Sequence, residues 1–209
     1  MYEPEGLVWA REEPSGELVV GITSIFAGLA GKLTTVKAKP IGADYALGNV
    51  IGSLEGGRHF GVIRSPVGGT LIAVNEAVLA RPKTLSESPY GEGWFARLRP
   101  TNWAAERATL WRAGAAAEAF ASQIATLHVR CFAAFPDYEM SEIGTECAAV
   151  LVKLNELLDR IEIGEVVHLV SDDWTAPIEM ERWSEERGQP VVESRREGNL
   201  YHFLVRKVH

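Results

Sequence analysis

The sequence predicts an α+β protein of several domains, with an all-β N-terminal unit, a helical connector and a C-terminal unit of alternating strands and helices. Three observations lead to this prediction. Short strand-like runs separated by glycine fill the first hundred residues. An alanine-rich stretch with high helix propensity follows, and strand and helix patterns then alternate to the end of the chain. We place the three parts at residues 1–101, 102–134 and 135–209.

The first unit begins with two strand-like runs, Leu7–Arg11 and Glu17–Ile22, on either side of the turn Pro14-Ser15-Gly16. The later runs are separated by Gly42, Gly48, Gly52, the pair Gly56-Gly57 and the pair Gly68-Gly69. Short strands between frequent glycine turns are typical of a barrel or a sandwich. We expect this unit to be all-β apart from one short helical turn.

Several motifs of the first unit resemble one known family. They are Val20-Gly21-Ile22-Thr23, Ala27-Gly28-Leu29-Ala30-Gly31, the Ser65-Pro66-Val67 turn with Gly69, Val74-Asn75-Glu76, and Pro89-Tyr90-Gly91-Glu92-Gly93-Trp94. From about Leu7 to Thr101 the chain resembles the H protein of the glycine cleavage system, a relative of lipoyl domains. The resemblance implies a barrel-sandwich hybrid fold.

The resemblance also locates the position at which the family carries lipoate. There, a lysine seven residues before the Ser-Pro turn forms an amide with lipoate, and the same spacing from Ser65 leads to Arg58. A guanidinium stays protonated and does not form this amide, so lipoate is not expected and no other cofactor is implied. Arg58, next to His59, either binds a phosphate or carboxylate group or is a solvated surface residue. Arg58, His59 and Arg64 are possible docking residues, and the two arginines suit the acidic C-terminal half.

The connector contains two stretches of high helix propensity, Trp103–Arg107 and Ala115–Phe132. Phe120, Ile124, Leu127 and Cys131 follow a 4, 3, 4 spacing, which places them on one face of a helix that Pro136 would end. We expect Cys131 to pack in the core or between domains, and the alternative is a resolving thiol.

The sequence pattern of the third part predicts a two-layer sandwich with the element order β-α-β-α-β-β. Its expected elements are a strand near Tyr138–Met140, a helix from Cys147, a strand Glu165–Val170, a helix Ala176–Arg187 capped by Ser171-Asp172-Asp173, and a hairpin of Pro190–Arg195 with Asn199–Lys207. The helix from Cys147 has an apolar face made of Val150, Leu151, Leu154, Leu157, Leu158 and Ile161.

Cys147 is the candidate nucleophile of the chain. It stands at the start of a predicted helix, where backbone N–H groups and the helix dipole favour a thiolate. The alternative is a small buried apolar residue, as most free cysteines are.

The third part also resembles the TusA-like family of sulfur carriers, over about Met140 to Lys207. The resemblance rests on Gly144-Thr145-Glu146-Cys147, Gly164-Glu165, Ser171-Asp172-Asp173, Pro177-Ile178 and Phe203-Leu204-Val205-Arg206-Lys207. It implies that Cys147 accepts sulfane sulfur as a persulfide and passes it on, without a metal or an organic cofactor. This chain has Ala148-Ala149 where the family has proline after the cysteine, and Ser141 where aspartate is usual. Glu146 would raise the pKa of the thiol if it lies close.

Two further histidines, His168 and His202, lie on predicted strands and could be neighbours. We interpret them as sheet-face residues, because no third ligand for a metal pair is evident.

Charge and composition limit the classes of partner. Residues 135–209 contain sixteen acidic and eight basic residues, which disfavours nucleic acid and suits a basic protein surface. Apolar runs are too short to span a bilayer, and the acidic N-terminus Met1–Gly6 is unlike a signal peptide. Two cysteines do not form a disulfide framework. We therefore expect a cytoplasmic protein that binds neither membrane nor nucleic acid.

The sequence thus favours a sulfur carrier that loads Cys147 from a donor protein and unloads it to an acceptor protein, with a docking domain that has lost lipoate. One alternative is a non-catalytic adaptor in a sulfur-transfer or lipoate-linked pathway. Another is a glycine cleavage H protein, against which Arg58 argues.

Overall fold

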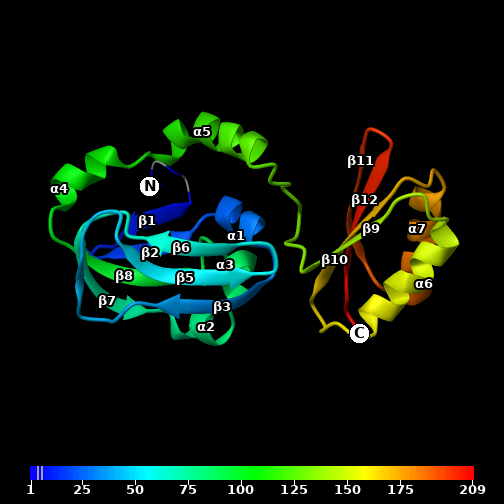
Figure 1. Cartoon of the computed structure of the whole chain (residues 1–209), viewed down its shortest axis with the longest axis horizontal. Helices are drawn as coiled ribbons and strands as arrows, with labels where there is room; N and C mark the ends of the chain where they lie inside the picture. Colours follow the sequence, from blue (N-terminus) through cyan, green and yellow to red (C-terminus); the bar gives the residue numbers. More distant parts are fainter. Residues whose placement is uncertain (4, 6) are drawn as a thin grey trace. The chain divides into compact units, whose positions relative to one another are not determined.

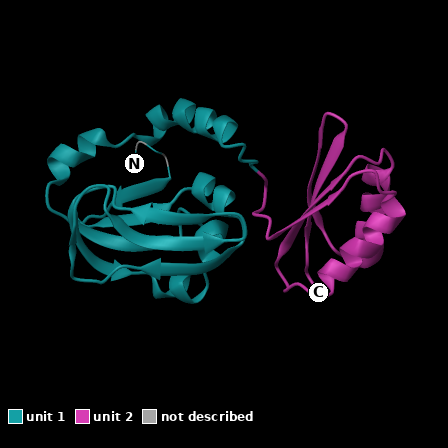
Figure 2. Cartoon of the chain, viewed as in Figure 1, with its two compact units in different colours: residues 1–131 teal, residues 132–209 magenta. Residues whose placement is uncertain are grey.

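The computed structural model describes residues 1–3, 5 and 7–209; Pro4 and Gly6 of the acidic N-terminal stretch lie outside the described residues. The chain divides into two compact units, residues 1–131 and 132–209 (Figure 2). Both contain sheets and helices, as the predicted fold class requires. Residues 102–131, which the sequence marks as a connector, belong to the first unit. Within the described ranges, no helix is both long and apolar enough to cross a membrane.

Two antiparallel sheets form the first unit (Figure 1). The larger sheet has the order β1 (Val8–Glu12), β2 (Leu18–Ile22), β8 (Trp94–Pro100), β7 (Gly69–Val74) and β4 (Asp44–Tyr45). The smaller sheet has the order β3 (Leu33–Ala38), β5 (Val50–Gly56) and β6 (Phe60–Arg64). In the part of the chain that the structure describes, the sheets do not join into a closed barrel. Their core includes the fully buried Leu18, Ile63 and Phe95.

The prediction of one helical turn before Pro100 is wrong, because the described residues of that segment include three short helices. They are α1 (Ser24–Ala30), α2 (Glu76–Ala80) and α3 (Thr84–Glu87). Asn75 explains α2: its side-chain oxygen accepts from the Ala77 N–H at 3.2 Å, and its amide donates to the carbonyls of Glu92 and Trp94, each at 2.8 Å. The Asn75 side chain therefore starts the helix and ties it to the chain that enters β8.

The helical end of the first unit is shorter than the sequence predicts. It consists of α4 (Trp103–Glu106), the 3₁₀ helix η1 (Arg107–Thr109) and α5 (Ala113–Thr126). His128 has φ of 52°, a left-handed conformation that commonly follows a helix end. Since α5 stops before it, Cys131 leaves the apolar stripe and is exposed. The prediction that Cys131 packs in a core is therefore wrong.

The second unit has the predicted β-α-β-α-β-β order. Its elements are β9 (Tyr138–Glu142), α6 (Cys147–Leu158), β10 (Val166–Ser171), α7 (Ala176–Arg187), β11 (Val191–Glu197) and β12 (Leu200–Arg206). The sheet order is β11-β12-β10-β9, in which β9 and β10 are parallel and the other pairs antiparallel. Helices α6 and α7 cover one face, where Leu154 and Trp183 pack with Leu169 and Phe203 of the sheet (Figure 1). This arrangement confirms the two-layer sandwich.

The two predicted strand histidines are neighbours. His168 Nε2 and His202 Nδ1 lie 2.9 Å apart, and the two rings stack at a centroid distance of 5.2 Å. Both residues are buried, and they alternate with the core residues Leu169 and Phe203, so they point to the face opposite the helices. The interpretation as sheet-face neighbours is confirmed.

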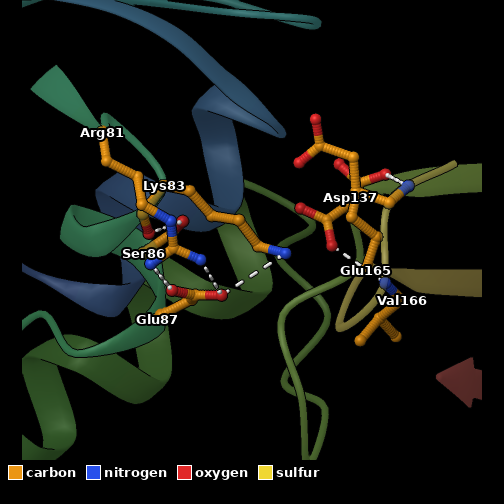
Figure 3. A network of polar contacts seen from close by, with 8 residues as sticks. Arg81, Lys83, Ser86, Glu87, Asp137, Glu165 and Val166 are labelled. Atoms are coloured by element: carbon orange, nitrogen blue, oxygen red, sulfur yellow. Dashed lines mark hydrogen bonds and ion pairs between the residues drawn. The ribbon is translucent and has the colours of Figure 1, made fainter. Parts of the chain in front are cut away.

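Side-chain carboxylates fix loops in each unit (Figure 3). In the first, Glu87 pairs with Arg81 at 2.7 Å and with Lys83 at 3.3 Å, which secures α3. In the second, Asp137 accepts from the Val166 N–H at 2.9 Å, where the chain enters β10. The bond from Val166 satisfies a backbone donor at the start of β10.

Candidate functional site

Cys147 is the first residue of α6, as predicted, and its side chain belongs to the core of the second unit. It is 4% exposed and packs with Val150 and Leu154. The preceding residue, Glu146, is the N-cap but makes no side-chain capping bond. The helix start therefore offers its backbone N–H groups to other partners.

Two aspartates of the β10–α7 loop hold the loop that leads to Cys147. Asp172 Oδ1 accepts from the Gly144 N–H at 2.7 Å, and Asp173 Oδ2 accepts from the Cys147 N–H at 2.8 Å. Asp173 Oδ1 also accepts from the Thr175 N–H and Oγ1, both at 2.8 Å. The prediction that these aspartates cap α7 is therefore corrected. The N-cap of α7 is Thr175, and Asp173 accepts hydrogen bonds both from Thr175 and from Cys147 at the start of α6.

The surroundings of Cys147 favour the thiol over the thiolate. Burial raises the pKa of the Cys147 thiol from 9.0 to about 11, and the Asp173 and Glu179 carboxylates add to the rise. The N–H that would stabilise a thiolate donates to Asp173 instead, and bonds from Thr175 and Cys147 lower the pKa of Asp173. Glu146, which the sequence suggested as the acidic neighbour, is not among the causes.

Asp173 and Glu179 were missed as parts of the site, although the sequence contained a signal for Asp173. It follows β10, Cys147 follows β9, and the two strands are parallel. The carboxyl ends of parallel strands meet at one edge of a sheet, so the two loops had to be neighbours.

Three large apolar side chains around these loops are exposed. Trp174 is 78% exposed, Ile178 is 67% exposed and Ile143 is 52% exposed. Ile143 precedes Gly144 in one loop, and Trp174 follows Asp173 in the other.

In the first unit, the structure separates Arg58 from the other two docking candidates. The Arg58 N–H donates to the Ala30 carbonyl at 3.1 Å, and its side chain lies over Gly31 at the end of α1. His59 and Arg64 instead line one groove of about 360 Å³ together with Phe26 and Phe60. His59 and Arg64 therefore share a surface that Arg58 does not line.

Metal-binding geometry is not found in the described ranges, where no three His, Cys, Asp or Glu residues are grouped to hold an ion. His168 and His202 bond to each other, and the carboxylates of Glu139 and Glu197 lie 3.7 and 3.5 Å from their outer nitrogens. The pair is a buried polar contact within the sheet.

The fold and the site define a class of two-part protein, in which a lipoyl-like unit precedes a unit with a cysteine at a helix start. Comparison with known families supports both parts. Residues 1–123 match the family described as glycine cleavage H-protein, and residues 142–207 match the family described as sulfurtransferase TusA. The chain belongs to the glycine cleavage H-protein family, and it is a fusion of such a domain with a TusA domain.

Individual relatives resemble the first unit. Glycine cleavage system H protein 5 of Aquifex aeolicus (strain VF5) is 31% identical over 129 residues, which cover 62% of this chain and 86% of the relative. The H protein of Stenotrophomonas maltophilia (strain K279a) is 38% identical over 94 residues, which cover 45% of this chain and 72% of the relative. A crystal structure of the H protein from Mycobacterium marinum aligns with a TM-score of 0.45 at 28% identity, over 48% of this chain and 82% of that one.

Proposed function

We propose that this protein is a cytoplasmic sulfur carrier that holds sulfane sulfur on Cys147 as a persulfide, between a donor protein and an acceptor protein. The observation that carries the proposal is that Cys147 is the sole cysteine in the span matching sulfurtransferase TusA, and stands at the first position of α6. A reducing compartment keeps such a thiol free.

Loading is a thiol exchange without net oxidation. The Cys147 thiol loses its proton, and the thiolate attacks the outer sulfur of a donor persulfide. The new S–S bond forms on Cys147 while the donor's S–S bond breaks, and the donor sulfur leaves as a thiolate that takes up a proton. With a pKa of about 11, the Cys147 thiol is largely protonated at neutral pH, so loading is slow in the free protein.

Unloading reverses the roles. A thiolate of the acceptor attacks the outer sulfur, and Cys147 leaves as a thiolate. A leaving thiolate of high pKa departs slowly, so the burial and the carboxylates that slow loading also slow premature release. The surroundings of Cys147 therefore suit a carrier that retains its sulfur until a partner changes the local charge.

We also propose that the first unit carries no lipoate and serves as a docking domain. Arg58 occupies the hairpin tip between β5 and β6, and its guanidinium does not form the lipoyl amide. His59 and Arg64 on the shared groove supply polar contacts for a protein partner. For the same reason we do not propose the role of a lipoate-bearing glycine cleavage H protein.

The loading experiment is peptide mass spectrometry after incubation with a low-molecular-weight persulfide. Sulfur should be added to the Cys147 peptide in the wild type and in Cys131→Ser, and not in Cys147→Ser. Equal loading of Cys147→Ser at other residues would contradict the carrier.

The lipoate experiment is incubation with a lipoate ligase and its substrates. The wild type should gain no lipoyl mass, while Arg58→Lys, which restores the amine, should be modified at the hairpin tip. A lipoyl adduct on the wild type would overturn the second proposal.

One observation favours a second function, that of a non-catalytic adaptor. Cys147 is almost fully buried and its pKa is raised, as for a structural cysteine. If Cys147→Ala binds the partners as the wild type does and sulfur flow between them is unchanged, the adaptor is correct.

A further inference from the structure

The loops around Cys147 expose apolar residues of a kind that folding ordinarily buries. Single exposed apolar side chains are common, but Ile143, Trp174 and Ile178 all belong to the two loops and the first helical turn next to one thiol. Tryptophan is enriched among the residues that dominate protein interfaces. The group is therefore a candidate contact surface.

These apolar residues stand on a fixed base. The bonds from Gly144 to Asp172 and from Cys147 to Asp173 join the two loops, and Asp173 is further fixed by Thr175. Trp174 comes directly before Thr175, the N-cap of α7, and Ile178 lies in the first turn of that helix. A surface held in this way loses little conformational entropy on binding.

The charge next to the surface indicates what the partner presents. Besides burial, which is the main cause of the raised pKa of the thiol, Asp173 and Glu179 act on it as negative charges. Glu179 is paired with Arg182 at 3.4 Å, but this ion pair is exposed and therefore weak, so a partner's cation can still approach Glu179. The unit as a whole contains sixteen acidic and eight basic residues. An acidic surface with an apolar centre is complementary to a protein surface with basic residues around an apolar centre.

We propose that Ile143, Trp174 and Ile178 form the docking surface for a partner protein that brings a basic side chain to Glu179, and that this contact activates Cys147. The proposal rests on the proposed sulfur-carrier function and names the partner chemistry and the regulation of that site. A cation at Glu179 offsets the negative charge beside the sulfur, so the thiolate forms more readily for loading and leaves more readily on release. Loading and release of sulfur are then slow in the free protein and fast in the docked protein.

The test uses the full chain with Cys131→Ser, so that Cys147 is the single thiol. Two peptides act as probes, one of leucine and arginine and one with glutamate in place of arginine, each with one cysteine activated as a 2-pyridyl disulfide. Cys147 forms an S–S bond with the peptide sulfur, the activated S–S bond breaks, and pyridine-2-thione is released and measured by its absorbance. The thiol gives its proton to the solvent, and the leaving pyridine-2-thiolate takes one up to become the thione.

We expect the arginine peptide to react at least about tenfold faster than the glutamate peptide at low salt. The ratio of the two rates should fall as salt is added. Glu179→Gln should reduce the ratio several-fold, while Glu181→Gln, which changes an exposed glutamate of the same helix, should leave it unchanged.

Trp174→Ala should slow the reaction of the arginine peptide several-fold without changing the rate with iodoacetamide. Ile163→Ala, an exposed residue after the far end of α6, is its matched control. A ratio near one in the wild type, or one unaffected by Glu179→Gln, would overturn the proposal.

A parallel measurement separates this proposal from the carrier function. If Cys147 gains sulfur from a low-molecular-weight persulfide but the peptide ratio is one, the docking surface is wrong and the carrier stands. If the peptide ratio is as expected but no sulfur is added, the carrier is wrong.

Discussion

Asp173 and Cys147 share one helix terminus, and the Asp173 carboxylate adds to the effect of burial, which is the main cause of the raised pKa of the thiol. The carboxylate accepts the Cys147 N–H at 2.8 Å and adds negative charge beside the sulfur. We expect the rate of Cys147 alkylation to rise with pH up to an inflection at about 11 in the wild type. In Asp173→Asn, whose amide oxygen still accepts the N–H, the inflection should move to lower pH because the charge is gone. Rates with iodoacetamide from pH 7 to 12 measure both, and an unchanged profile would show that the Asp173 charge does not contribute to the raised pKa.

At the same scale, the sequence could predict the position of Cys147 but not its protonation state. The apolar repeat from Val150 to Ile161 defines the helix, and therefore its first residue. The charge at that residue depends on Asp173 and Glu179, which lie on another loop and another helix. Their contact with Cys147 follows from the sheet, through the parallel pairing of β9 and β10.

Among the elements, the β5–β6 hairpin tip lies against the end of α1, and Gly56 makes this approach possible. The Arg58 and Gly57 N–H groups donate to the Ala30 and Lys32 carbonyls. A Cβ at Gly56 would overlap the Ala30 carbonyl oxygen, whereas one at Gly57 would meet open space. Gly56→Ala should therefore reduce the free energy of unfolding by about 1–3 kcal/mol, and Gly57→Ala by less than about 0.5 kcal/mol. Urea unfolding of the two variants measures the difference, and equal effects would contradict the close approach.

Strands β10 and β12 are joined by the buried His168–His202 bond as well as by their backbone ladder. Replacing one histidine by leucine leaves the facing nitrogen of the other without this bond, at a cost of about 1–3 kcal/mol. The double replacement removes both polar groups, so it should cost clearly less than the sum of the two single replacements. Denaturant unfolding of the four proteins of the cycle gives the coupling, and additive costs would show that the bond contributes nothing.

The elements of the second unit were predictable because their periodicities are regular, with apolar repeats in the helices and β-rich runs in the strands. In the first unit, α2 was missed because it is only one turn long and depends on Asn75 bonding to Glu92 and Trp94, distant in sequence. The end of α5 was misplaced because His128 adopts a positive φ. Neither glycine nor proline marks that position, so the pattern of apolar residues continued past the helix.

For the whole molecule, the helical segment after β8 decides where the first unit ends. Tyr2 and Trp111 exchange two backbone hydrogen bonds, of 2.9 and 2.8 Å, and Phe120 packs edge-on against Tyr2 at 4.6 Å. Leu110 and Ala116 are buried. These contacts bind the segment to the N-terminal strand region, and residues 1–131 form one compact unit.

We therefore expect residues 1–131 and 132–209, produced separately, each to unfold in one cooperative transition, because each has its own buried core. Residues 1–101 should unfold at a lower urea concentration than residues 1–131, because the truncation exposes the side chains that Leu110, Ala116 and Phe120 cover. Circular dichroism with increasing urea measures all three fragments. Equal midpoints for 1–101 and 1–131 would show that the helical segment is a connector after all. Loading of Cys147 in residues 132–209 at the rate of the full chain would show that the first unit takes no part in the loading chemistry.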